Sequence, residues 1–81
     1  MARLYPLEGP IQRLEGPFTL TQLQGFVGGD IELVDLRTDD VLVVQKDSWF
    51  KLPINMTASS IAGLKPPVCG PALICSPDDI A

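Results

Sequence analysis

The stretch Val41-Leu42-Val43-Val44-Gln45-Lys46 decides the fold, because its first four residues are apolar without alternation. A strand that is apolar on both faces belongs in the middle of a sheet, where both faces are covered. The preceding stretch, Asp30–Leu36, carries a charge on each side, at Glu32 and at Asp35. The four residues between the two stretches, 37–40, are typical of a turn. The sequence therefore predicts a β-hairpin.

A short helix is predicted before this hairpin. Thr19 and Gln22 have the capping-box spacing, in which each side chain accepts a hydrogen bond from the other residue's backbone N–H. Phe18 and Leu23 are placed to form the hydrophobic contact that often accompanies such a cap. The pair Gly28-Gly29 should end the helix, since glycine adopts the left-handed C-terminal conformation without strain.

A second short helix and a last strand are predicted after the hairpin. Asn55 is suited to cap a helix that runs through Met56, Ala58, Ile61 and Ala62 and closes at Gly63. Residues 68–75 are predicted to form the last strand, with a bulge or edge feature at Gly70-Pro71. The element order is β-α-β-β-α-β. This order predicts an α+β fold with two short helices on one face of a small, mainly antiparallel sheet.

The 81 residues suffice for one domain. Three prolines, at positions 6, 10 and 17, restrict residues 1–17 to an extended N-terminal arm or an edge strand. Residues 18–75 are expected to form the single α+β domain. Residues 76–81 are expected to be a frayed tail.

Charge and hydropathy exclude several kinds of partner. The net charge is −4 and the six basic residues are scattered singly, which argues against DNA or RNA binding. The longest apolar run, residues 41–44, is far shorter than a membrane span, and the N-terminus lacks the apolar region of a signal peptide. Cys69 and Cys75 are too far apart for a disulfide if the strand between them is extended. We expect reduced cysteines and a cytoplasmic protein.

The sequence offers few groups for catalysis. It has no histidine, so it lacks the usual general base at neutral pH and the commonest metal ligand. The pairs Asp39-Asp40 and Asp78-Asp79 are predicted to be solvated charges in a turn and in the tail. Two cysteines without histidine do not make a structural zinc site. We expect no cofactor, no metal and no enzymatic activity.

Three motifs occur in a recognisable order: Val27-Gly28-Gly29-Asp30-Ile31-Glu32, then Leu52-Pro53-Ile54-Asn55-Met56-Thr57-Ala58, and last Val68-Cys69-Gly70-Pro71-Ala72-Leu73-Ile74. The order resembles a family of small proteins of unknown function from bacteriophages, prophages and mobile elements. The family's pattern is VGG-x-IE, LP-x-N-x-x-A and G-x-x-V/I. The likeness covers about residues 20–75 and implies a phage-type protein without transferable catalytic residues. The sequence departs from the pattern at Trp49-Phe50, Pro71 and Cys75.

The candidate binding residues cluster before and within the second helix. Trp49 and Phe50 either cap the core or anchor a partner, since tryptophan is common in interface hot spots. Lys51, Asn55 and Thr57 could hold a phosphate at the helix start while Trp49 stacks on a base. The residues expected to serve turns and caps are Thr19, Gln22, Gly28, Gly29, Gly63 and Gly70.

These features lead to three hypotheses. The first is an accessory protein that binds and inhibits a host bacterial protein, as an anti-defence or host-takeover factor. The second is a homo-oligomeric sponge that sequesters a nucleotide immune signal. The third is a minor structural or assembly protein.

Overall fold

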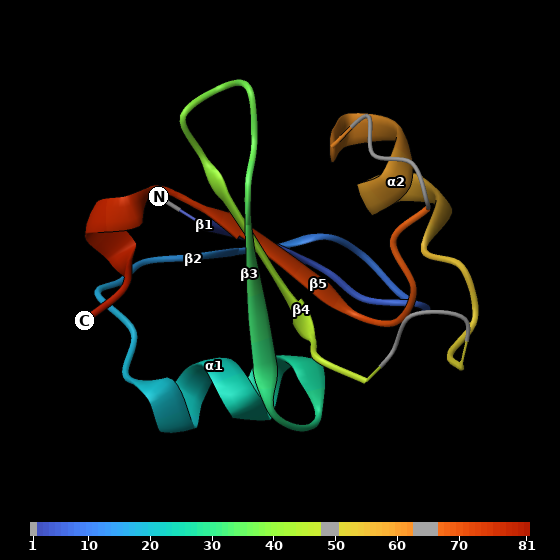
Figure 1. The fold of residues 1–81 in the computed structure, drawn as a ribbon, viewed down its shortest axis with the longest axis horizontal. Helices are drawn as coiled ribbons and strands as arrows, with labels where there is room; N and C mark the ends of the chain where they lie inside the picture. The colour runs from blue at the N-terminus through green and yellow to red at the C-terminus, as the bar shows by residue number, and fades with distance from the viewer. Residues whose placement is uncertain (1, 48–50, 63–66) are drawn as a thin grey trace.

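A five-stranded antiparallel sheet forms the centre of the protein (Figure 1). The computed structural model describes residues 2–47, 51–62 and 67–81. The strands, in spatial order, are β2 (Gln12–Leu14), β1 (Ala2–Tyr5), β5 (Ala72–Cys75), β4 (Val41–Gln45) and β3 (Ile31–Asp35). Every neighbouring pair of these strands is antiparallel. The predicted α+β class with a mainly antiparallel sheet is confirmed.

Strand β4 has the two-sided burial that its sequence predicts. Residues 41–44 are all buried. Val43 belongs to the apolar core on one face of the sheet, and its neighbours Leu42 and Val44 belong to the core on the other face. The predicted hairpin is also present, since β3 pairs with β4 along its whole length.

Helix α1 (Leu20–Val27) begins and ends as predicted. Both hydrogen bonds of the capping box are present: Thr19 N donates to Gln22 Oε1 at 2.9 Å, and Gln22 N donates to Thr19 Oγ1 at 3.2 Å. Gly28 ends the helix with φ at 85°. At Gly29 a Cβ would lie 2.7 Å from Nε2 of Gln45, so a larger residue there would displace this side chain from its hydrogen bond with the Gly28 carbonyl.

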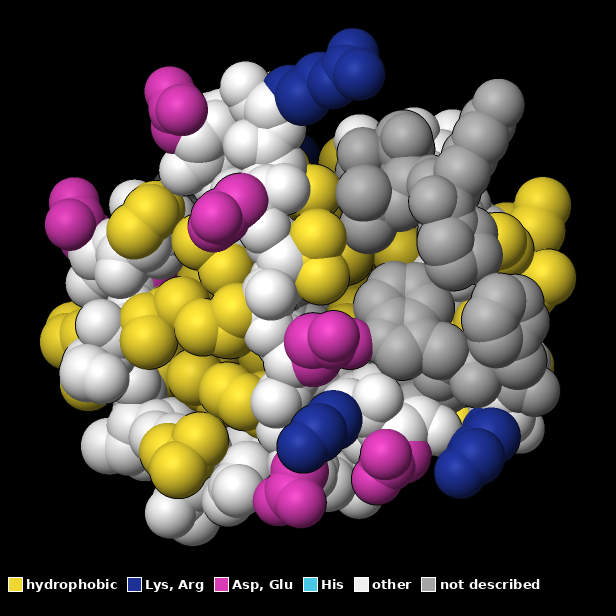
Figure 2. Space-filling model, in the orientation of Figure 1, with side chains coloured by type: hydrophobic (Ala, Val, Ile, Leu, Met, Phe, Trp, Pro, Cys, Tyr) yellow, Lys and Arg dark blue, Asp and Glu magenta, His cyan; other side chains and the backbone are white. Residues whose placement is uncertain are grey.

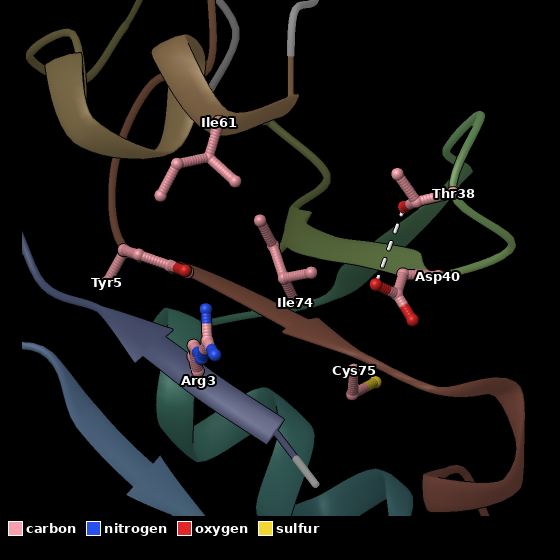
Figure 3. Close-up of a pocket in the computed structure, with 7 residues that line it drawn as sticks. All are labelled: Arg3, Tyr5, Thr38, Asp40, Ile61, Ile74 and Cys75. Atoms are coloured by element: carbon pink, nitrogen blue, oxygen red, sulfur yellow. Dashed lines mark hydrogen bonds between the residues drawn. The ribbon is translucent and has the colours of Figure 1, made fainter.

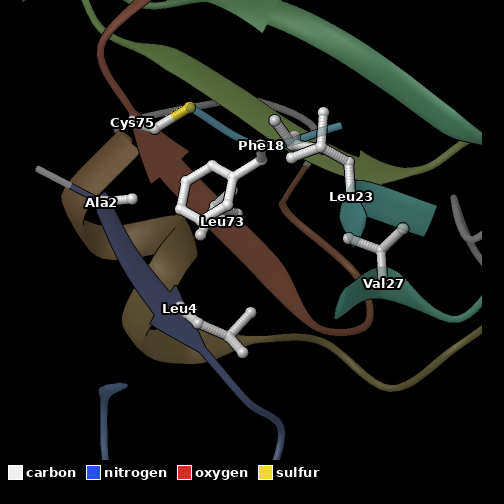
Figure 4. Close-up of a cluster of buried hydrophobic side chains, with 8 residues drawn as sticks. Ala2, Leu4, Phe18, Leu23, Val27, Leu73 and Cys75 are labelled. Carbon is white, nitrogen blue, oxygen red and sulfur yellow. The ribbon is translucent and has the colours of Figure 1, made fainter. Parts of the chain in front are cut away.

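The two helices pack on opposite faces of the sheet, so the expectation that they share one face is wrong. Leu23 and Val27 of α1 pack in a core that includes Val43. Figure 4 shows these two side chains of α1 among others of this core. Ala58 of α2 (Met56–Ala62) packs with Leu42 in the second core. The physical reason lies in β4, because both of its faces are apolar and each needs a cover.

Helix α1 is too short to cover its whole face of the sheet. Leu33 in β3 is paired with Val43, yet its side chain remains 49% exposed. On the face shown in Figure 2, acidic side chains surround a hydrophobic area to the left of β3. Some apolar side chains of the sheet therefore lie outside the two cores, exposed on the surface.

Residues 1–17 contribute two strands to the sheet. β1 pairs with β2 on one side and with β5 on the other, so β1 is an interior strand and β2 is the edge strand. Gly9, with φ at 93°, lies in the connection between them. The element order is therefore β-β-α-β-β-α-β, with one strand more than the sequence pattern predicts. The alternation of buried Ala2 and Leu4 with exposed Arg3 is the pattern of a strand that packs on α1's side.

Residues 76–81 are ordered against the N-terminal half, so the expected frayed tail is wrong. A short 3-10 helix, η1 (Pro77–Asp79), has its own capping box between Ser76 and Asp79. Phe18 N donates to the Asp79 carbonyl at 2.6 Å, and Ala81 N donates to the Phe18 carbonyl at 2.9 Å. Gly16 lets the chain pass closely here, because a Cβ would lie 2.9 Å from that Asp79 oxygen.

The last strand is shorter than predicted. Gly70 adopts a φ of 78°, which interrupts the extended chain before β5 begins at Ala72. Cys69 forms an isolated antiparallel bridge with Ile54, and Gly70 N donates to the Pro53 carbonyl at 2.8 Å. The predicted turn role of Gly70 is thereby confirmed. Gly63, expected to end α2, lies outside the described residues.

Candidate functional site

Asn55 connects three separate segments of the chain. Its side chain is 3% exposed. Its Nδ2 donates to the carbonyls of Tyr5, at 2.8 Å, and Gly70, at 3.0 Å, and its Oδ1 accepts from Ala58 N at 3.1 Å. The predicted cap of α2 is confirmed. The side chain is not free for the predicted ligand contact, because both of its N–H donors and one acceptor position of its oxygen already serve the fold.

Two of the other expected binding residues make no hydrogen bond with Asn55. Lys51 and Thr57 are both exposed, and neither side chain has a hydrogen bond within the described residues. Ser59 is occupied, since its Oγ accepts from Val68 N at 2.8 Å. Trp49 and Phe50 lie outside the described residues. The predicted phosphate site at the start of α2 therefore lacks a free Asn55 side chain.

A groove lies instead on the face of the sheet that α2 covers only in part (Figure 3). It consists of two hollows, of about 260 Å³ and about 330 Å³, that share Arg3, Tyr5 and Ile61. The first hollow extends towards the β3–β4 turn and the second towards β2. The residues that complete the lining are Thr38, Asp40, Ile74 and Cys75 in the first hollow, and Ile11 and Arg13 in the second.

Two arginines lie side by side at one end of this groove. Arg3 of β1 and Arg13 of β2 are direct partners in the antiparallel register. Like charges placed directly opposite each other destabilise a sheet. Within residues 2–47, 51–62 and 67–81, no carboxylate forms an ion pair with either guanidinium. A chain of net charge −4 therefore carries a local concentration of uncompensated positive charge.

Asp40 gives the opposite end of the groove a negative charge. It follows the β3–β4 turn and accepts a hydrogen bond from the Thr38 hydroxyl at 3.4 Å. Figure 3 shows Asp40 separated from Arg3 by Ile74 and Cys75. The groove is therefore basic at the β1–β2 end, apolar in its middle and acidic at the turn. This arrangement can orient a ligand that has an anionic group at one end.

Tyr5 places a hydroxyl at the basic end. Its side chain is 2% exposed, and its ring belongs to the core beneath α2. No group among the described residues hydrogen-bonds to the hydroxyl. No fully buried side-chain N or O of these residues lacks a partner, so this oxygen must reach the open space of the groove. Figure 3 shows it pointing towards the same space as the Arg3 guanidinium.

Both cysteines are free and buried, as expected. Burial raises the pKa of the Cys75 thiol from 9.0 to about 11, with smaller contributions from the charges of Asp79 and Asp40. The thiol is therefore protonated at neutral pH, and it packs in the core on α1's side of the sheet. In the described part of the chain, no three acidic or cysteine side chains gather as a metal site would need. No helix within the same residues is long and apolar enough to cross a membrane.

Comparison with known proteins shows the family. The model of the family described as "Domain of unknown function (DUF3846)" matches residues 4–81, and the chain belongs to this family. The match begins within β1 and includes β2, whereas the expected likeness covered about residues 20–75. No curated protein and no solved structure matches the chain.

The groove residues were missed because the basic residues are scattered along the sequence. Arg3 and Arg13 are ten positions apart, and only the hairpin register makes them neighbours. One signal was available: Arg3 and Tyr5 stand two positions apart in an alternating stretch, which places their side chains on the same face. The turn at Gly9-Pro10 would have suggested the pairing with Arg13.

We expect Asn55→Ala to lower the free energy of unfolding by about 2–4 kcal/mol, because two buried carbonyls and one N–H lose their partner. Thr57→Ala, two residues away on the exposed side of α2, should change it by less than about 0.5 kcal/mol. Urea unfolding followed by circular dichroism measures both. Equal stability of the two variants would contradict the structural role of Asn55.

The raised pKa of Cys75 predicts a loss of stability in alkali. The thiol ionises near its ordinary pKa of 9.0 when unfolded and near 11 when folded, so the unfolded state loses its proton first. The free energy of unfolding should fall by about 2–3 kcal/mol as the pH rises through this range. Cys75→Ala should show a shallower fall than the wild type in urea titrations at pH 8–11. Parallel curves for both proteins would refute the burial effect.

Proposed function

We propose that the protein acts by non-catalytic binding and that the groove holds a negatively charged segment of a host protein. The observation that carries this proposal is the Arg3–Arg13 pair, which the sheet keeps together while no carboxylate of the described residues forms an ion pair with either arginine. Such a pair costs stability in the free protein and is relieved when an anionic partner binds. A surface that is unfavourable alone and favourable in a complex is typical of a binding site.

The shape of the groove supports a partner that lies across the sheet. Its two hollows follow one another from β2 to the β3–β4 turn, with Ile61 of α2 exposed along one side. Charged ends and an apolar middle are the elements from which specific protein interfaces are built. Because the net charge of the chain is −4, the attraction for an anionic segment acts at short range, at the arginine pair.

The biological role that we assign is that of a phage-type accessory protein. The three sequence motifs resemble a family from bacteriophages and mobile elements, and the chain is a member of a family of unknown function. A small acidic domain with a groove that is basic at one end suits a factor that occupies a functional surface of a host protein and thereby inhibits it. Anti-defence and host takeover are the processes in which we place it, within the host cytoplasm.

A pull-down from bacterial lysate at moderate salt tests this proposal. The wild type should retain a discrete host protein, and Arg13→Glu should lose it. Lys46→Glu makes the same change of charge at an exposed position outside the groove and should retain the partner. Finding no retained protein, or one that both variants retain equally, would count against binding through the groove.

A nucleotide is a second candidate ligand, favoured by the size of the groove. Hollows of about 260 and 330 Å³ that share three residues offer space near that of small-molecule sites. In this case the protein is a sponge that lowers the free concentration of a signal. The groove residues replace Asn55 in this hypothesis, since the Asn55 side chain is occupied.

A thermal-shift screen with cyclic and linear nucleotides tests the sponge. A ligand present at 100 times its Kd should add about 2.7 kcal/mol to the stability of the folded protein. Arg13→Glu should abolish the shift, and Lys46→Glu should leave it unchanged. If no nucleotide changes the melting temperature, the sponge hypothesis fails while the host-protein hypothesis stands.

A further inference from the structure

The Tyr5 hydroxyl is a polar group that the fold positions but does not use. The ring is fixed by the core, and the backbone of Tyr5 is fixed by Asn55, whose Nδ2 donates to its carbonyl. The hydroxyl can donate one hydrogen bond and accept others, yet no described residue meets it. A phenylalanine would fill the same place in the core. The hydroxyl therefore makes no hydrogen bond with the described part of the fold and is available to a ligand.

The Arg3–Arg13 pair surrounds the same space with further donors. Direct partners in an antiparallel pair have Cβ atoms about 4.5–5.5 Å apart, so the two guanidiniums can reach one group between them. Both arginines line the same hollow as Tyr5. Three side chains with unused donors, one of them almost completely buried, thus converge on one end of the groove.

We propose that Arg3, Tyr5 and Arg13 form a binding site for a phosphoryl group. The proposal rests on the groove being the binding surface and names the chemical group that it recognises. A phosphomonoester carries almost two negative charges at neutral pH and three acceptor oxygens, which match two guanidiniums and one hydroxyl. A carboxylate carries one charge and would leave one arginine uncompensated. The group can belong to a small phosphorylated molecule or to a phosphorylated side chain of the partner.

The rest of the groove restricts the ligand further. Asp40 lies at the opposite end, so a ligand with a chain of phosphates along the groove would meet a like charge there. Ile61 and Ile74 line the space between the two ends and favour an uncharged body. The site should therefore prefer a monophosphate to the corresponding triphosphate, with hydrogen-bond donors of the ligand directed towards Asp40.

Calorimetric titration tests the site with inorganic phosphate, phosphoserine and a nucleoside monophosphate, each at matched ionic strength. We expect saturable binding, about tenfold weaker for Tyr5→Phe and weaker still for Arg13→Gln, and unchanged for Lys46→Gln. Tyr5→Phe should melt at the wild-type temperature without ligand, because the Tyr5 hydroxyl that it removes has no partner among the described residues. The tighter of phosphoserine and the nucleotide identifies the source of the phosphoryl group. Affinity should fall as the pH drops below about 6, where the phosphomonoester gains a proton.

The outcomes separate this proposal from the proposed function. If none of the three probes binds saturably while a host partner is lost on Arg13→Glu, the groove binds a protein and the phosphoryl site is refuted. If the probes bind but Tyr5→Phe and Arg13→Gln bind them as the wild type does, the assignment of these residues is refuted. If the probes bind as expected and no host protein is retained, the phosphoryl site stands and the host-protein function fails.

Discussion

The apolar character of β4 on both faces is the constraint on which the rest of the structure depends. A strand with Leu42 and Val44 on one side and Val43 on the other cannot lie on a single-sided core. The chain meets this requirement with one helix on each face: α1 has eight residues and α2 has seven. Helices of this length cannot cover a five-stranded sheet. The uncovered areas, the groove beside α2 and the exposed Leu33 beside α1, follow from that shortage of helix.

Local features of the fold were predictable, and distant pairings were not. The capping box at Thr19, the end of α1 at Gly28 and the β3–β4 hairpin depend on residues close in sequence, so short patterns identify them. The placement of β1 between β2 and β5 is different, because the residues of β5 that pair with β1 lie about 70 positions further along the sequence. The order of the tail depends likewise on contacts between Ile80 and Phe18. No pattern within either segment specifies such a partner.

The candidate site shows the same division in a sharper form. The sequence identifies Asn55 as a helix cap. It does not show that the side chain is occupied, because the carbonyls that it binds, those of Tyr5 and Gly70, are distant in sequence. In the sequence Arg3 and Arg13 are two isolated basic residues, and only the pairing of β1 with β2 makes them neighbours. Two like charges on neighbouring strands indicate a binding site only after the register of the strands is known, because the sequence does not show that they are adjacent. Local reasoning fails most readily at positions of this kind.

The position of β5 has a consequence for how the protein is made. It is the last of the five described strands along the sequence, yet it lies between β1 and β4 and supplies the only pairing that joins the two hairpins within the described sheet. Until β5 emerges, the nascent chain holds two separate hairpins whose inner edges, β1 and β4, have unpaired backbone groups. Such edges pair readily with other chains. Insertion of β5 therefore closes two edges at once and removes both from reach of other chains.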